Sequence, residues 1–83
     1  MTCQVLSISS LKPSKLGGQY RWYFLKDLET GRSVRCPVVP TYGNSVRWQG
    51  VKVGQILEGL HLINGSKDIV DADSQFRVKE GFL

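Results

Sequence analysis

Residues 20–39 read YRWYFLKDLETGRSVRCPVV, two runs of β-branched and aromatic residues separated by the polar sequence Glu29-Thr30-Gly31. Residues of this kind favour strands and glycine favours turns, so the stretch predicts a β-hairpin. Thr-Gly is not the pair that a two-residue type I′ turn prefers. We therefore expect a three-residue loop with Gly31 in the left-handed conformation.

The length of this loop decides which side chains face the core. A three-residue loop places Leu28 opposite Arg32, and stepping back by twos pairs Lys26 with Val34, Phe24 with Cys36 and Trp22 with Val38. The outward surface then holds Arg21, Tyr23, Leu25, Asp27, Ser33, Arg35 and Pro37. A shift by one residue would instead expose Trp22, Phe24, Lys26 and Arg35. We expect the first register, because the second leaves too much aromatic surface in water for so small a protein.

Outside the hairpin the chain continues as short β-rich segments. Further runs lie at 4–11, 53–63, 68–73 and 75–80, and nine glycines and three prolines interrupt any longer helical pattern. Asn64-Gly65 predicts a hairpin turn between two of these runs. Five or six strands in 83 residues predict a single all-β domain over residues 1–83, a small barrel of OB-like or SH3-like type. Residues 40–50 form its longest irregular connection.

The composition excludes several classes of protein. Two cysteines and one histidine supply neither a disulfide scaffold nor a four-ligand structural zinc site. The chain has no apolar run long enough to span a membrane, and its first residues lack the pattern of an export signal. We expect a cytoplasmic protein with no metal, no cofactor and no membrane partner.

Catalytic side chains are scarce. A Ser/His/Asp or Cys/His site would have to use His61, which lies in the strand-like run ILEGLHLI, where we expect its ring to be partly packed. Three aspartates, Asp68, Asp71 and Asp73, lie close together, but no glycine-bearing calcium loop follows them. We interpret them as residues of a solvated strand or turn, and we expect no enzyme.

Positive charge and aromatic rings gather in the first two thirds of the chain. Residues 1–52 hold eight Lys and Arg against two acidic residues, whereas residues 53–83 hold three against five, and the whole chain carries +4. Single-stranded nucleic acid needs this combination, because bases stack on rings while cations neutralise phosphates. The expected contact residues are Arg21, Tyr23 and Arg35 of the hairpin and Tyr42, Arg47, Trp48 and Lys52 of the long connection.

The strand order, the hairpin at 20–39 and the later VGQILEGL run before NGSK resemble the small OB-fold single-stranded-DNA-binding proteins of bacteria and phages. In such proteins the ligand lies across the second and third strands, flanked by loops, so the resemblance implies the same contact residues. One feature departs from the pattern. OB folds commonly place a helix between the third and fourth strands, and residues 40–50 are short and glycine-rich for one. An SH3-like barrel and a minimal OB fold without the helix both stay open.

Two functions follow as hypotheses. The first is a non-catalytic protein that binds single-stranded nucleic acid, DNA rather than RNA, with low sequence specificity. The alternative is a small barrel that serves in protein interaction, as an adaptor or inhibitor subunit docking on an acidic partner through the same basic surface. A chain of this size is also a candidate for homodimerisation.

Overall fold

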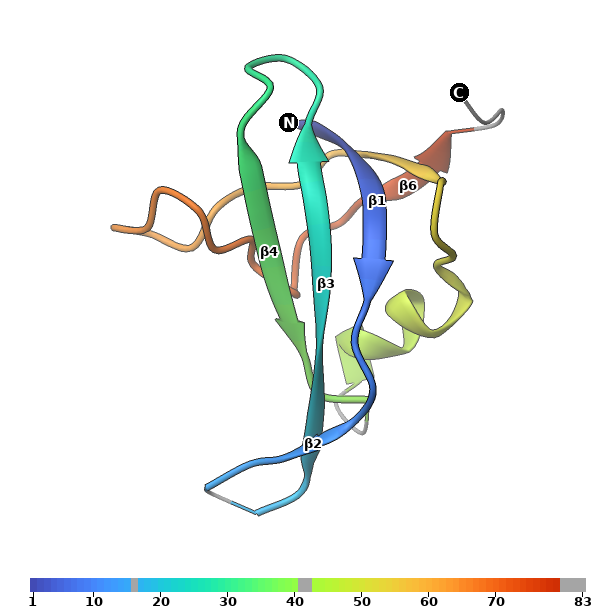
Figure 1. The fold of residues 1–83 in the computed structure, drawn as a ribbon, viewed down its shortest axis with the longest axis vertical. Helices are drawn as coiled ribbons and strands as arrows, with labels where there is room; N and C mark the ends of the chain where they lie inside the picture. The colour runs from blue at the N-terminus through green and yellow to red at the C-terminus, as the bar shows by residue number, and fades with distance from the viewer. Residues whose placement is uncertain (16, 41–42, 80–83) are drawn as a thin grey trace.

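Six β-strands and one 3₁₀-helix form the part of the chain that the computed structural model describes, residues 1–15, 17–40 and 43–79 (Figure 1). The elements in chain order are β1 (Thr2–Ile8), β2 (Lys12–Pro13), β3 (Gln19–Asp27), β4 (Ser33–Val38), the 3₁₀-helix η1 (Gly43–Gly50), β5 (Ile56–Glu58) and β6 (Arg77–Lys79). The predicted all-β class is confirmed. The last two strands are shorter than the runs from which they were predicted.

All strands pair antiparallel in one sheet, with β3 at its centre. β3 pairs with β4 along one edge and with β1 and β2 along the other, and β1 continues through β5 to β6. Two isolated bridges extend this path, one parallel between Arg35 and Ile69 and one antiparallel between Leu62 and Val70. The first bridge connects the outer edge of β4 to the segment at residues 69–70, and the second connects that segment to Leu62, which follows β5. The strands do not close into a complete barrel, but their pairing is compatible with an OB-like one.

The predicted turn at Asn64-Gly65 is present. The Ile63 N–H donates to the carbonyl of Ile69 at 2.8 Å, and Gly65 has a φ of 85°, a left-handed conformation that suits glycine. The loop brings Ile69 back beside Arg35, so this turn positions part of the β4 edge.

The register predicted for the β3–β4 hairpin is wrong by one residue. Tyr23 pairs with Cys36 and Phe24 with Arg35, which turns Tyr23, Leu25 and Asp27 inward and Trp22, Phe24 and Lys26 outward. The assignment of Val34, Cys36 and Val38 to the core is confirmed, because only the phase of β3 has changed.

A four-residue loop, in place of the predicted three, causes the shift. The Asp27 N–H donates to the Arg32 carbonyl at 2.8 Å, so residues 28–31 form the loop between them. The Asp27 carboxylate accepts the Glu29 N–H at 2.9 Å, and Gly31, with a φ of 77°, donates its N–H back to the Asp27 carbonyl. The side chain of Asp27 therefore caps the start of the four-residue loop. The position of Gly31 alone does not reveal this loop length.

The long connection after β4 also differs from its expected irregular form, because residues 43–50 make η1. Trp48 of this helix is fully buried, and its ring lies 4.9 Å from that of Tyr23 and 4.6 Å from that of Phe76, measured between centroids. The ring of Phe76 belongs to the core. One tryptophan therefore anchors η1 against the inner side of the sheet. No helix among the described residues is long and apolar enough to cross a membrane.

Candidate nucleic-acid interface

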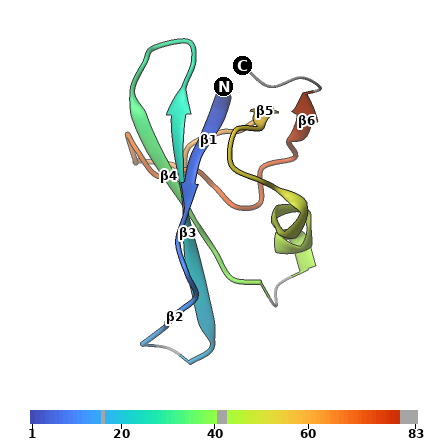
Figure 2. The same cartoon turned by 45° about the vertical axis from the view of Figure 1, so that its right-hand side comes forward.

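One side of the sheet formed by β1, β3 and β4 is covered and the other presents aromatic and basic side chains. η1, β5 and β6 all lie on the covered side (Figure 2). Since side chains alternate along a strand, the residues of β3 between the buried ones point to the opposite side. We call this surface the outer face; it consists of Tyr20, Trp22, Phe24 and Lys26 of β3 and of Arg35 and Pro37 of β4.

Phe24 and Arg35 are direct neighbours across the two strands. The Arg35 N–H donates to the Asp68 carbonyl at 2.9 Å, and its own carbonyl accepts the Val70 N–H at 2.8 Å. Both backbone groups of Arg35 therefore point away from β3, which makes Phe24 and Arg35 a non-hydrogen-bonded pair, the kind with the closer side chains. Phe24 is 39% exposed and Arg35 is exposed, so ring and cation are presented together.

Trp22 is fixed in place from three directions. Its N–H donates to the Ser9 hydroxyl at 2.8 Å, and its carbonyl accepts the Ser9 N–H at 2.9 Å. The Arg35 guanidinium carbon lies 4.9 Å from the centroid of the Trp22 ring, within the range of a cation–π contact. The Tyr20 ring meets Trp22 edge-on at 6.1 Å. Trp22 is half-buried, and the contacts with Arg35 and Tyr20 orient its ring.

Pro37 lies opposite Trp22 at another non-hydrogen-bonded position. Its missing N–H costs no ladder bond there, because that position faces the outer edge of β4. The pyrrolidine ring of Pro37 extends the apolar part of the outer face beside Trp22. The outer face therefore holds apolar rings in its middle and the cations Lys26 and Arg35 around them.

Three of the residues predicted as contacts belong to the hairpin, and the structure separates them. Arg35 is exposed on the outer face as expected. Arg21 and Tyr23 are instead turned inward by the one-residue register shift, and Tyr23 is only 3% exposed. The Tyr23 hydroxyl donates to the Trp48 carbonyl at 2.8 Å, and burial raises its pKa, while the Arg21 charge opposes that rise. Tyr23 is a core residue and offers no free ring.

The residues predicted in the long connection do not join the outer face. Trp48 is 0% exposed, and its indole N–H donates to the Ala72 carbonyl at 3.0 Å, so its expected exposure is wrong. Arg47 is exposed on η1, on the covered side of the sheet, and Lys52 is exposed just beyond that helix. Tyr42 lies outside the described residues.

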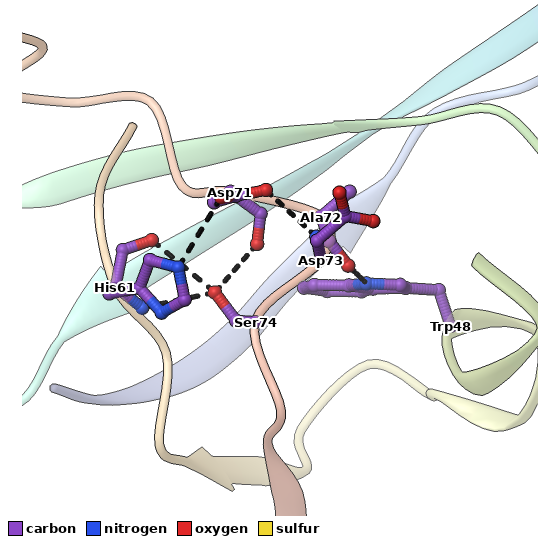
Figure 3. Close-up of polar contacts among 6 residues, drawn as sticks. All are labelled: Trp48, His61, Asp71, Ala72, Asp73 and Ser74. Atoms are coloured by element: carbon purple, nitrogen blue, oxygen red, sulfur yellow. Dashed lines mark hydrogen bonds and ion pairs between the residues drawn. The ribbon is translucent and has the colours of Figure 1, made fainter. Parts of the chain in front are cut away.

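A serine, a histidine and an aspartate meet near Trp48 (Figure 3). His61 Nε2 lies 3.3 Å from an Asp71 carboxylate oxygen, and the His61 side chain is 59% exposed, against the partly packed ring expected from the sequence. The Ser74 hydroxyl accepts the His61 N–H and donates to the Asp71 carbonyl at 2.6 Å. The Ser74 hydroxyl therefore bonds to backbone groups, and its role is to stabilise the turn.

Asp71 and Asp73 belong to the same turn, since the Asp73 N–H donates to the Asp71 carboxylate at 2.9 Å. Within residues 1–15, 17–40 and 43–79, no cluster of three or more His, Cys, Asp or Glu is arranged to hold a metal ion. The acidic residues of this segment thus lie where the sequence analysis put them, in a solvated turn.

Sequence reasoning assigned Trp22 and Phe24 to the core and so missed the two main rings of the outer face. The signal that could have found them is Asp27, an aspartate placed directly before a loop that ends in glycine, which favours a capped four-residue turn. With that turn, the alternation of β3 reverses and the exposed aromatic residues follow.

Comparison of the chain with protein-family models, with curated proteins and with solved structures finds no match. A function is therefore inferred from the geometry of the described residues.

Proposed function

We propose that this protein binds single-stranded nucleic acid on its outer face, with low sequence specificity and without catalysis. The observation that carries the proposal is the placement of Trp22 and Phe24 on one exposed strand face with Arg35 next to both. DNA rather than RNA is the ligand that the resemblance to small OB-fold DNA-binding proteins implies.

The chemistry of these residues supports this ligand. Every base has a flat π-face, so a ring accepts any base, and each stack contributes about 1–3 kcal/mol. Trp22 and Phe24 lie two residues apart on β3, about 7 Å along the strand, which leaves room for a separate base on each ring. Low sequence specificity follows, because stacking reads no base edge.

Charge supplies the second part of the affinity. Lys26 and Arg35 lie beside the rings on the outer face. Within residues 1–52 acidic residues are few, since Asp27 is turned inward and Glu29 is the other one; the exposed Asp68 lies at the outer edge of β4, where its carbonyl accepts the Arg35 N–H. Phosphates of a strand lying over the rings would therefore meet mainly positive charge.

Fluorescence anisotropy of a labelled single-stranded oligonucleotide tests the proposal, with a duplex of the same sequence and heparin as comparators. We expect the single strand to bind more tightly than the duplex, because a duplex does not offer its bases for stacking. Equal binding of all three polyanions would contradict stacking and indicate a general attraction of charge.

Two variants test the rings directly. Phe24→Ala and Trp22→Ala are each expected to weaken single-strand binding by about 1–3 kcal/mol. Val53→Ala is the matched control, an exposed apolar side chain outside the outer face, and should leave binding unchanged. Circular dichroism confirms that each variant is folded.

The same experiment separates the alternative function, docking on an acidic protein. In that case oligonucleotide binding would be weak, would depend on Lys26 and Arg35 alone, and would be unaffected by truncation of Phe24. Indifference of single-strand binding to both ring variants, in folded protein, would overturn the nucleic-acid proposal in favour of a protein-docking face.

A further inference from the structure

A cavity of about 320 Å³ lies on the inner side of β3, on the side of the sheet away from the outer face. Its walls are mostly apolar, with contributions from Ile8, Leu11, Val38 and Val51. Leu11 is 39% exposed, so this wall reaches solvent and the cavity has an opening. We call it the Arg21 pocket, because Arg21 is the charged residue among those that line it.

The Arg21 guanidinium is held in this pocket without a protein partner of its own. Its Nε is buried and has no hydrogen-bond partner among the described residues, and none of their ion pairs involves Arg21. The other two polar side chains that line the pocket donate elsewhere: the Tyr23 hydroxyl donates to the Trp48 carbonyl, and the Gln49 amide nitrogen donates to the Pro40 carbonyl at 3.3 Å. Among the described residues, no carboxylate lines the cavity.

A buried donor without a partner is costly to a fold, about 1–3 kcal/mol. Arg21 therefore does little for the stability of the sheet through its guanidinium. A single cation at the wall of an apolar cavity is complementary to a molecule that carries one negative group on an apolar body.

We propose that the Arg21 pocket binds a small amphipathic monocarboxylic acid. The carboxylate pairs with the Arg21 guanidinium, and the aliphatic or aromatic body of a ligand with about ten non-hydrogen atoms in all lies among Ile8, Val38 and Val51. The cavity is at the small end of the range for ligand sites, which suits a body of this size. The site lies on the other side of β3 from Trp22 and Phe24 and does not depend on the proposed nucleic-acid function.

Octanoate and its neutral counterpart octanamide are the probes, followed by amide chemical shifts in a ¹H–¹⁵N NMR titration of the whole chain. We expect saturable shifts centred on Ile8, Arg21, Val38 and Val51. Octanoate should bind at least about tenfold more tightly than octanamide, because a charge-assisted pair is worth about 1.5–3 kcal/mol and 1.4 kcal/mol is a factor of ten. Butyrate should bind more weakly, since it fills less of the cavity.

Arg21→Met keeps the unbranched side-chain stem and removes the guanidinium. It should abolish the preference for octanoate over octanamide and should not lower the thermal midpoint, a result that a structural arginine would not give. Arg47→Met is the matched control, an exposed arginine that does not line the pocket. Leu11→Glu, at the exposed rim, is a second variant that should weaken octanoate but not octanamide by charge repulsion.

Three results would overturn the proposal: equal binding of octanoate and octanamide, a preference that survives both Arg21→Met and Leu11→Glu, or no saturable binding at millimolar concentration. Octanoate should also leave oligonucleotide anisotropy unchanged, and Trp22→Ala should leave octanoate binding unchanged. Failure of oligonucleotide binding would therefore leave the proposal for the Arg21 pocket standing. Failure of octanoate binding would leave the proposal for the outer face standing.

Discussion

The Asp27 carboxylate holds the β3–β4 loop by accepting the Glu29 N–H, and this hydrogen bond lowers the pKa of Asp27. A lowered pKa stabilises the fold above the ordinary value of 3.8 and loses that contribution as pH falls through the folded-state value. We expect Asp27→Ala to cost about 1–2 kcal/mol at neutral pH and less in acid. Urea unfolding at both pH values measures this.

The matched control for Asp27 is Glu29→Ala, which removes an exposed carboxylate but keeps the N–H that Asp27 accepts. This variant should change stability little at either pH. A cost of Asp27→Ala that is the same in acid and at neutral pH would show that charge on Asp27 does not contribute to the turn.

Cys36 is the second residue whose environment makes a measurable difference. Its thiol is fully buried, and burial, followed by the Asp71 charge, raises its pKa to about 12. The thiolate is the reactive form, so we expect native protein to resist a thiol reagent at mildly alkaline pH, with labelling only as fast as unfolding exposes the group. Mass spectrometry during the reaction measures this, with urea-unfolded protein as the comparator. Rapid labelling without unfolding would contradict the burial of β4.

Substitutions of buried residues of β3 and of their core partners should cost more stability than substitutions on the outer face. Tyr23→Phe removes the hydroxyl bonded to the Trp48 carbonyl and should lower the free energy of unfolding by about 1 kcal/mol. Trp48→Ala empties the centre of the core and should lower it by about 3–5 kcal/mol. Phe24→Ala, between two buried positions, should cost less than either. Thermal unfolding followed by circular dichroism measures all three. A larger loss for Phe24→Ala than for Tyr23→Phe would contradict the register.

Most of the strands were predictable from sequence, but η1, β2 and the phase of β3 were not, and the predicted run 68–73 makes only isolated bridges. The β-rich runs and the turn residues Gly31 and Asn64-Gly65 located the strands, because residue type acts locally. The phase of β3 depended on whether the loop holds three or four residues, and a single residue inverts every side chain. The phase with Trp22 and Phe24 in the core was expected because exposed aromatic surface is unfavourable in so small a protein, and this expectation was wrong.

The burial of Trp48 was also not predictable from the sequence. Within GNSVRWQG nothing marks one ring as a core residue, and its position follows from tertiary contacts with Tyr23, Ala72 and Phe76. These partners are far apart in the sequence, so burial of Trp48 is a property of the assembled sheet. Arg35, by contrast, was placed correctly, because the phase of β4 did not depend on the loop.

For the whole molecule, the proposed phosphate contacts predict binding that weakens with salt. Each neutralised phosphate contributes about −0.7 to the slope of log affinity against log salt for single strands, so the two cations of the outer face, Lys26 and Arg35, give about −1.4. Arg35→Gln should reduce the slope by about one contact, whereas Phe24→Ala should leave it unchanged. Anisotropy titrations over a salt series measure the slopes. A flat response would contradict phosphate contacts altogether.

Arg35 takes its backbone hydrogen bonds from Asp68 and Val70, more than thirty residues further along the chain. Contacts so distant in sequence form only once both segments are present, and the long intervening loop makes their closure costly in entropy. During synthesis the β3–β4 hairpin therefore leaves the ribosome before the residues that pair with the outer edge of β4. The proposed ligand face would be complete only after residues 68–70 have joined that edge, and not with the hairpin that carries the rings.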